Sequence, residues 1–129
     1  MKRRLSRIVV VLAFSGWLLT SSGCLYRHHN AACKQRAAAL SATIETLKQQ
    51  AHDALKIGTK KEAVTRFFTE QGLPVAFDHG YASGAVGIVG CAPSGCGSDN
   101  GLLGVTVKVD QDGTVIADPV VSAMYTNCL

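Results

Sequence analysis

Five cysteines are the residues of this chain best suited to covalent chemistry. Cys24 lies near the N-terminus with Cys33 shortly after it, Cys91 and Cys96 flank a short loop, and Cys128 follows much later. A thiolate can be alkylated, oxidised to a disulfide or used to bind a metal ion. No two of these residues have the Cys-x-x-Cys spacing of redox motifs. We therefore expect modification of Cys24 and structural disulfides among the other four.

The residues before Cys24 have the pattern of a bacterial export signal. An apolar run from Ile8 to Leu19 is followed by the small residues Ser21-Ser22-Gly23. The run is shorter than the roughly 20 residues that a membrane-spanning helix needs. Four basic residues precede it: Lys2, Arg3, Arg4 and Arg7. We expect residues 1–23 to be a cleaved signal peptide.

This pattern resembles a lipoprotein signal peptide with its lipobox. The resemblance implies a diacylglyceryl thioether on Cys24, cleavage after Gly23 and acylation of the new amino terminus by a fatty acid such as palmitate. Leu25 stands where the inner-membrane lipoproteins of Gram-negative bacteria carry Asp, which for a Gram-negative source favours an outer-membrane anchor facing the periplasm. Ser21 occupies the usual aliphatic position of a lipobox, and Ser21 with Gly23 also suits ordinary signal peptidase. The alternative is a secreted or periplasmic soluble protein with an unmodified Cys24.

The composition predicts a single domain whose net charge is zero once the signal peptide is removed. The chain has 13 Lys and Arg against 9 Asp and Glu, and the formal excess of +4 comes from the four basic residues of the signal. The mature chain then has no excess of positive charge with which to bind nucleic acid. It also has no net charge that would attract an ionic small-molecule substrate. Its roughly 100 residues suffice for one modest core. We expect a tether over residues 24–30 and one domain over residues 31–129.

The four cysteines after Cys24 are an even set, as two disulfides require. Three connectivities are possible. The spacing across Pro93 and Gly95 favours a local bridge between Cys91 and Cys96, with Cys33 joined to Cys128. The second choice pairs Cys91 with Cys128 and Cys33 with Cys96. A bridge that closes a long loop contributes about 4 kcal/mol in the chain-entropy model.

Two amphipathic helices are predicted in the first half of the domain. The first runs from about Ala31 to Leu55, and Gly58 ends it. Its apolar stripe comprises Leu40, Ile44, Leu47, Ala51 and Leu55. The second runs from about Lys60 to Gln71, starts at a capping box formed by Thr59 and Glu62, and buries Phe67 and Phe68.

Three antiparallel strands are predicted in the second half, over 81–91, 102–109 and 114–125. An Asp112-Gly113 turn joins the last two, and the third is broken near Asp118-Pro119. Along the middle strand, every second residue is a large apolar one, so these residues share one face: Leu103, Val105, Val107 and Val109. Helices followed by strands predict an α+β, ααβββ two-layer sandwich.

No catalytic, metal or cofactor site is predicted, and we expect a protein that is not an enzyme. His28 and His29 lie next to each other, so with Cys33 they do not form a zinc motif. The Asp-rich segments 99–101 and 110–113 lack the calcium-loop pattern and are interpreted as turns. Ser94 has no base arranged beside it in the sequence.

The lipobox, the segment Leu55-Lys56-Ile57-Gly58-Thr59, the later Gly72-Leu73-Pro74 and the three strands resemble the small SmpA/OmlA-like lipoproteins of outer-membrane assembly and the related β-lactamase-inhibitor-like folds. The resemblance covers residues 55–125. It implies a non-catalytic, protein-binding module of cell-envelope assembly or maintenance, with an inhibitor-like module against an envelope enzyme as the alternative. Phe77, Tyr81 and Tyr125 are the predicted partner contacts.

Overall fold

The computed structural model describes the backbone of residues 21–128 and the side chains of residues 31–128. The predicted signal peptide falls almost entirely outside this range, and the side chain of Cys24 is also outside it. The chain divides into two units between Ala32 and Cys33. The fold described below is that of the second unit.

Helix α1, Ser21–Ala54, begins earlier than the predicted start at Ala31 and its backbone includes residues 24–30, where a tether is predicted. No Gly or Pro interrupts residues 24–57, so nothing in the local sequence stops the helix. The predicted stripe is confirmed, because Leu47, Ala51 and Leu55 are buried and Ile44 packs against them. The partly buried Cys33 and Arg36 continue the same stripe towards the N-terminus.

Helix α2, Lys61–Glu70, buries Val64, Phe67 and Phe68 as its apolar pattern predicts. The predicted capping box is wrong, because the N-cap residue is Lys60 and its side chain makes no capping bond. Thr59 lies one residue before the N-cap position of α2, and hydrogen bonds to other segments hold it there. Its carbonyl accepts from the Val115 amide at 2.9 Å, and its hydroxyl donates to the Ala54 carbonyl at the end of α1.

The sheet has four antiparallel strands in the order β1-β2-β3-β4, so the α+β class is confirmed and the predicted number of three strands is wrong. The strands are β1 (Ala76–Asp78), β2 (Tyr81–Val89), β3 (Asn100–Lys108) and β4 (Val120–Tyr125). The additional strand β1 pairs with β2 through a tight turn whose central residues, His79 and Gly80, both have positive φ, as right-twisted hairpins require.

Strand β4 begins at Val120, after Pro119, and not at Thr114 as predicted. Pro119 lacks the amide that a ladder needs, which explains the predicted break. Before it, Val115 makes only an isolated bridge with Val109. The Asp112-Gly113 turn forms as predicted, because the Asp110 carboxylate accepts from the amides of Asp112 and Thr114 at 3.0 and 2.8 Å.

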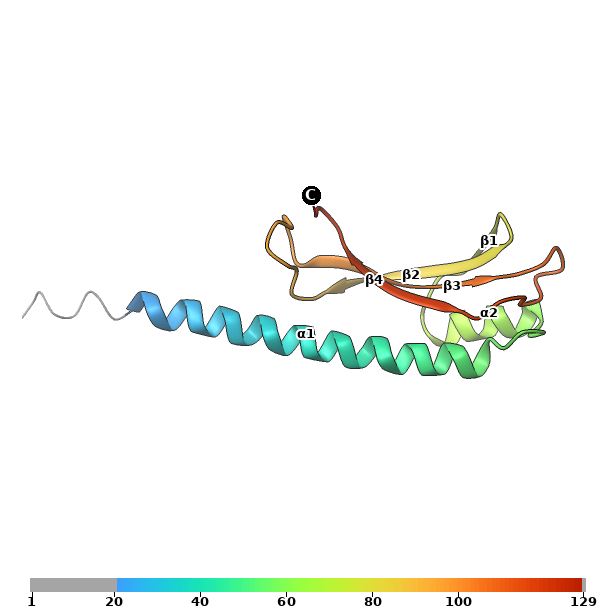
Figure 1. Cartoon of the computed structure of the whole chain (residues 1–129), viewed down its shortest axis with the longest axis horizontal. Coiled ribbons are helices and arrows are strands. Elements are labelled where there is room, and N and C mark those ends of the chain that lie inside the picture. The colour runs from blue at the N-terminus through green and yellow to red at the C-terminus, as the bar shows by residue number, and fades with distance from the viewer. Residues whose placement is uncertain (1–20, 129) are drawn as a thin grey trace, which may run out of the picture. The chain divides into compact units, whose positions relative to one another are not determined.

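Both helices cover the same face of the sheet (Figure 1). Ala82 of β2 is buried on this inner face. The four predicted alternating positions of the middle strand are buried there as well: Leu103, Val105, Val107 and Val109. Gly84 in β2 permits a close approach of α2 and of the segment that follows it. A Cβ atom there would lie 2.6 Å from the Pro74 carbonyl and 2.8 Å from the Phe68 ring.

Candidate functional site

Two disulfides join chain segments at one end of the sheet. Cys33 of α1 is bonded to Cys91, which follows β2, and Cys96 is bonded to Cys128, which follows β4. All four predicted cysteines are therefore paired, but both predicted connectivities are wrong and the third possibility is observed.

The sheet register explains this pairing. The last pair of β3 and β4 is Gly101 with Tyr125. Beyond it, the segment before β3 and the segment after β4 meet once more, where Cys96 and Cys128 form an isolated bridge. Cys96 thus meets Cys128 and turns away from Cys91. Cys91 leaves the end of β2 beside the partly buried stripe of α1, where Cys33 lies.

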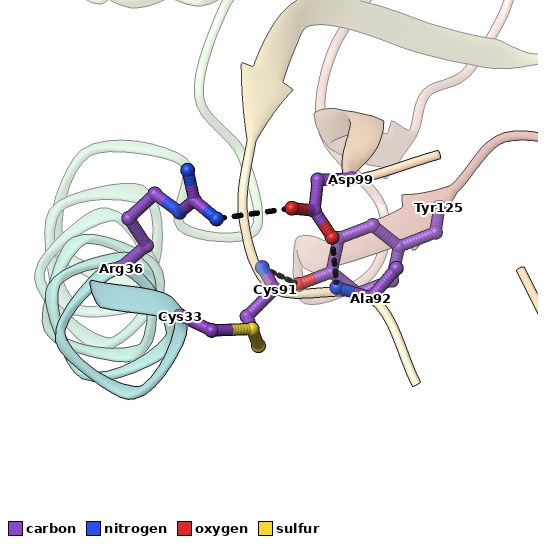
Figure 2. Close-up of polar contacts among 6 residues, drawn as sticks. All are labelled: Cys33, Arg36, Cys91, Ala92, Asp99 and Tyr125. Atoms are coloured by element: carbon purple, nitrogen blue, oxygen red, sulfur yellow. Dashed lines mark hydrogen bonds and ion pairs between the residues drawn. A yellow bond between two sulfur atoms is a disulfide. The ribbon is translucent and has the colours of Figure 1, made fainter. Parts of the chain in front are cut away.

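Polar contacts surround the Cys33–Cys91 disulfide (Figure 2). The Asp99 carboxylate accepts from the Arg36 guanidinium and from the Ala92 amide, both at 3.0 Å. The Cys91 amide donates to the Tyr125 hydroxyl, also at 3.0 Å. We call this group the clasp: the Cys33–Cys91 disulfide with Arg36, Asp99 and Tyr125. It connects α1, the loop between β2 and β3, and the end of β4.

The clasp includes residues that the sequence interpretation missed. Arg36 lies four residues before Leu40, so it is a charged residue on an otherwise apolar stripe. Such a position indicates that the helix meets an acidic partner there. Asp99 gave no such indication, because an Asp in a turn-rich loop is common.

The face of the sheet opposite the helices carries exposed apolar side chains. Met124 is 61% exposed, Val120 62% and Leu102 42%. The register places these residues on one side, around a hollow of about 360 Å³ that is lined by small residues such as Ala85 and Gly104. We define the outer face by these residues of three strands: Tyr81, Ser83, Ala85, Leu102, Gly104, Thr106, Val120, Ser122 and Met124. The register also places two exposed charged residues on this side, Asp78 of β1 and Lys108 of β3, each opposite Tyr81 at one end of the face.

Of the three predicted contact residues, Phe77 and Tyr81 line one pocket of about 420 Å³ beside the β1–β2 turn, whereas Tyr125 lies elsewhere. Tyr81 is on the outer face and 43% exposed. Phe77 packs against the core, with the Lys61 ammonium 4.9 Å from its ring centroid. Tyr125 belongs to the clasp at the other end of the sheet. As partner contacts, all three stay predictions.

The residues that the structure describes contain no group of three or more His, Cys, Asp or Glu side chains placed to hold a metal ion. Cys33 is engaged in a disulfide and has no thiolate to offer a metal. In the same part of the chain, no helix is both long and apolar enough to cross a membrane.

Comparisons with protein-family models, with curated proteins and with solved structures found no match to this chain. The resemblance to the SmpA/OmlA-like lipoproteins and to β-lactamase-inhibitor-like folds therefore stays a prediction.

Proposed function

We propose that this protein is an exported, lipid-anchored and non-catalytic module that binds another protein through the outer face of its sheet. The observation that carries the proposal is the exposure of Leu102, Val120 and Met124 on the face of the sheet that, among the described residues, neither α1 nor α2 covers. Apolar side chains gathered on one flat surface are typical of contact sites for other proteins. The proposed setting is cell-envelope assembly or maintenance.

The proposed anchor is a diacylglyceryl group on Cys24 that holds the protein at the outer membrane, facing the periplasm. The export pattern before Cys24 supports it. The disulfides support it as well, because Cys33, Cys91, Cys96 and Cys128 pair with one another and these bridges do not use Cys24. Several acyl chains together give stable membrane attachment, whereas a single chain gives only marginal binding. Secretion as a soluble protein is the alternative.

Site-specific photo-crosslinking in the intact cell envelope tests the binding surface. A photoreactive amino acid would replace Leu102, Val120 or Met124, and Glu45 or Lys48 on the exposed side of α1 would serve as matched controls. We expect all three outer-face positions to crosslink to the same protein and the controls to give none. Crosslinks from the controls alone, or only to lipid, would refute the proposal. The intact mass of the mature protein reports the anchor separately.

One observation favours a second candidate function, an inhibitor-like module. The exposed residues Pro93 and Ser94 lie between Cys91 and Cys96, and each of these cysteines is bonded to a different part of the domain. Inhibitory loops bind tightly when they are held rigid before binding. Crosslinking from Ser94 to an envelope enzyme, with no crosslinks from the outer face, would favour this candidate.

A further inference from the structure

The two disulfides join cysteines that are consecutive in the chain once Cys24 is set aside. Cys33 pairs with the next cysteine, Cys91, and Cys96 pairs with the next, Cys128. The bridged segments, with sequence separations of 58 and 32, follow one another and do not overlap. We infer that both bridges form in the order in which the cysteines are exported, without disulfide isomerisation, and that the thioether on Cys24 sets this order. The second half of the inference rests on the proposed lipid anchor.

The chemistry of each bridge is a two-electron oxidation by a dithiol oxidase in its disulfide form. The first exported thiolate attacks the oxidase disulfide and forms a mixed disulfide. The next thiolate of the chain then attacks its own chain's sulfur and releases the oxidase as a dithiol. Two thiols lose two electrons and two protons, and the oxidase gains both. When the cysteines are exported one after another, this exchange joins the cysteine held in the mixed disulfide to the next cysteine that is exported.

A free thiol at Cys24 would shift the pairing by one cysteine. The same order of export would then join Cys24 to Cys33 and Cys91 to Cys96, and Cys128 would have no partner. Both of these bridges close far shorter loops than the native ones, so loop-closure entropy also favours them. The thioether prevents the shift, because its sulfur has no proton to lose and cannot act as a thiolate.

The shifted pairing is incompatible with the observed fold. Cys24 and Cys33 both belong to α1. A helix that contains both residues separates their Cα atoms by about 13 Å, which is well beyond the roughly 7 Å that a disulfide allows. A bridge between Cys91 and Cys96 would remove the Cys33–Cys91 disulfide of the clasp and the Cys96–Cys128 disulfide together. Alkylation of Cys24 must therefore precede the oxidation of Cys33. In that step the Cys24 thiol loses its proton, its sulfur bonds to a glyceryl carbon of a diacylglyceryl phosphate ester, and the bond from that carbon to the phosphate oxygen breaks to release the phosphate group.

Disulfide mapping of the exported protein tests this inference. Three proteins would be expressed in Gram-negative hosts with and without their periplasmic disulfide isomerase. The first is the natural chain. The second carries an ordinary signal peptide in place of residues 1–23 and so keeps Cys24 as a thiol, and the third has the same signal with Cys24→Ser. Thiols would be trapped with acid, and peptides would be mapped by mass spectrometry.

We expect the natural chain and the C24S protein to contain only the Cys33–Cys91 and Cys96–Cys128 bridges in both hosts. The protein with a free Cys24 should contain Cys24–Cys33 and Cys91–Cys96 in the host without isomerase, with a several-fold loss of the native bridges. Native pairing of this protein without isomerase would overturn the role of Cys24. Mispairing of the C24S protein without isomerase would overturn consecutive oxidation itself.

The intact mass of the natural chain separates these results from the proposed anchor. An unmodified Cys24 with correct bridges in both hosts would refute the anchor and the role of the thioether, while the C24S protein still decides the order of oxidation.

Discussion

At the scale of single residues, Asp99 is the residue on which the polar part of the clasp depends. One of its oxygens accepts from Arg36 and the other from the Ala92 amide. The Asp99 and Arg36 side chains remain 35% and 41% exposed, so solvent screens their attraction. The amide contact is local and orders the loop between β2 and β3. The two partners of Asp99 should therefore contribute unequally to stability.

We expect Asp99→Ala to lower the free energy of unfolding by about 1–2 kcal/mol, because it leaves the Ala92 amide without its acceptor. Arg36→Met keeps the aliphatic stem and should lower it by less than about 1 kcal/mol. Urea unfolding with the disulfides intact measures both. The exposed pair of Lys48 and Glu45 provides a control, and Lys48→Met should have almost no effect. An Arg36→Met effect larger than that of Asp99→Ala would contradict this assignment.

A second residue-scale difference concerns two glycines of β2. Gly84→Ala should lower the free energy of unfolding by about 1–3 kcal/mol, because the new methyl group would meet the Pro74 carbonyl and the Phe68 ring. Gly87→Ala is the matched control, since no atom lies within 4 Å of its Cβ position. Alanine there should be neutral or slightly stabilising. Thermal unfolding of the two variants checks this, and equal losses would show that Gly84 is not in close contact.

At the scale of elements, the two ends of α1 are held by different interactions. The C-terminal part is buried in the core through Leu47, Ala51 and Leu55. Between Cys33 and Leu40 only Arg36 is partly buried, and the other residues are exposed. In that part, the clasp connects the helix to the sheet. The disulfide should therefore have a local effect on the helix in addition to its effect on the unfolded chain.

We expect the double substitution Cys33→Ser/Cys91→Ser to lower the free energy of unfolding by about 4 kcal/mol on the chain-entropy model. It should also remove most amide-exchange protection from residues 34–42 and leave residues 47–54 protected. Hydrogen exchange read by mass spectrometry measures this difference. The matched control is Cys96→Ser/Cys128→Ser, which should leave protection of α1 unchanged. Equal loss along the whole helix in the first variant would count against a local role of the clasp.

The periodicity of apolar residues in the sequence predicted the helices and strands that bury one side against the common core. The stripe of α1 and the alternation of Leu103, Val105 and Val107 could be predicted, because an element buried on one side repeats its apolar residues at the spacing of that element. Strand β1 escaped prediction because three residues are too short to show alternation. The disulfide connectivity escaped because it depends on how β3 and β4 extend beyond Tyr125 and on which side of α1 carries Cys33. Both are properties of the tertiary register, and local spacing does not report them.

At the scale of the whole molecule, the two faces of the sheet differ in burial. The inner face supplies the core, and the outer face contributes little to it, because its apolar residues remain exposed. Stability and the proposed binding function should therefore be separable by substitution. We expect substitutions in the clasp and the core to affect stability, and substitutions on the outer face to affect the proposed binding.

We expect the double substitution Val120→Thr/Met124→Gln to change the free energy of unfolding by no more than about 0.5 kcal/mol, since both side chains are largely exposed. The same protein should lose the crosslinks from Leu102 that the binding proposal predicts. Val105→Ala in the core serves as the comparison and should lower the free energy of unfolding by about 2–3 kcal/mol. A large loss of stability in the outer-face variant would mean that this face is part of the core.

Because the bridged segments follow one another, the covalent structure is two closed rings in series, joined by residues 92–95. A protease that cuts inside either ring leaves one covalently continuous molecule. A single cut in the connecting segment instead yields two fragments with no bond between them, each still closed by its own disulfide. Non-covalent contacts alone would then keep the halves together: the pairing of β2 with β3, the buried side chains around it, and hydrogen bonds such as those of the clasp. The exposed turn at Pro93 and Ser94 is thus the one stretch between Cys33 and Cys128 where backbone hydrolysis alone could divide the domain.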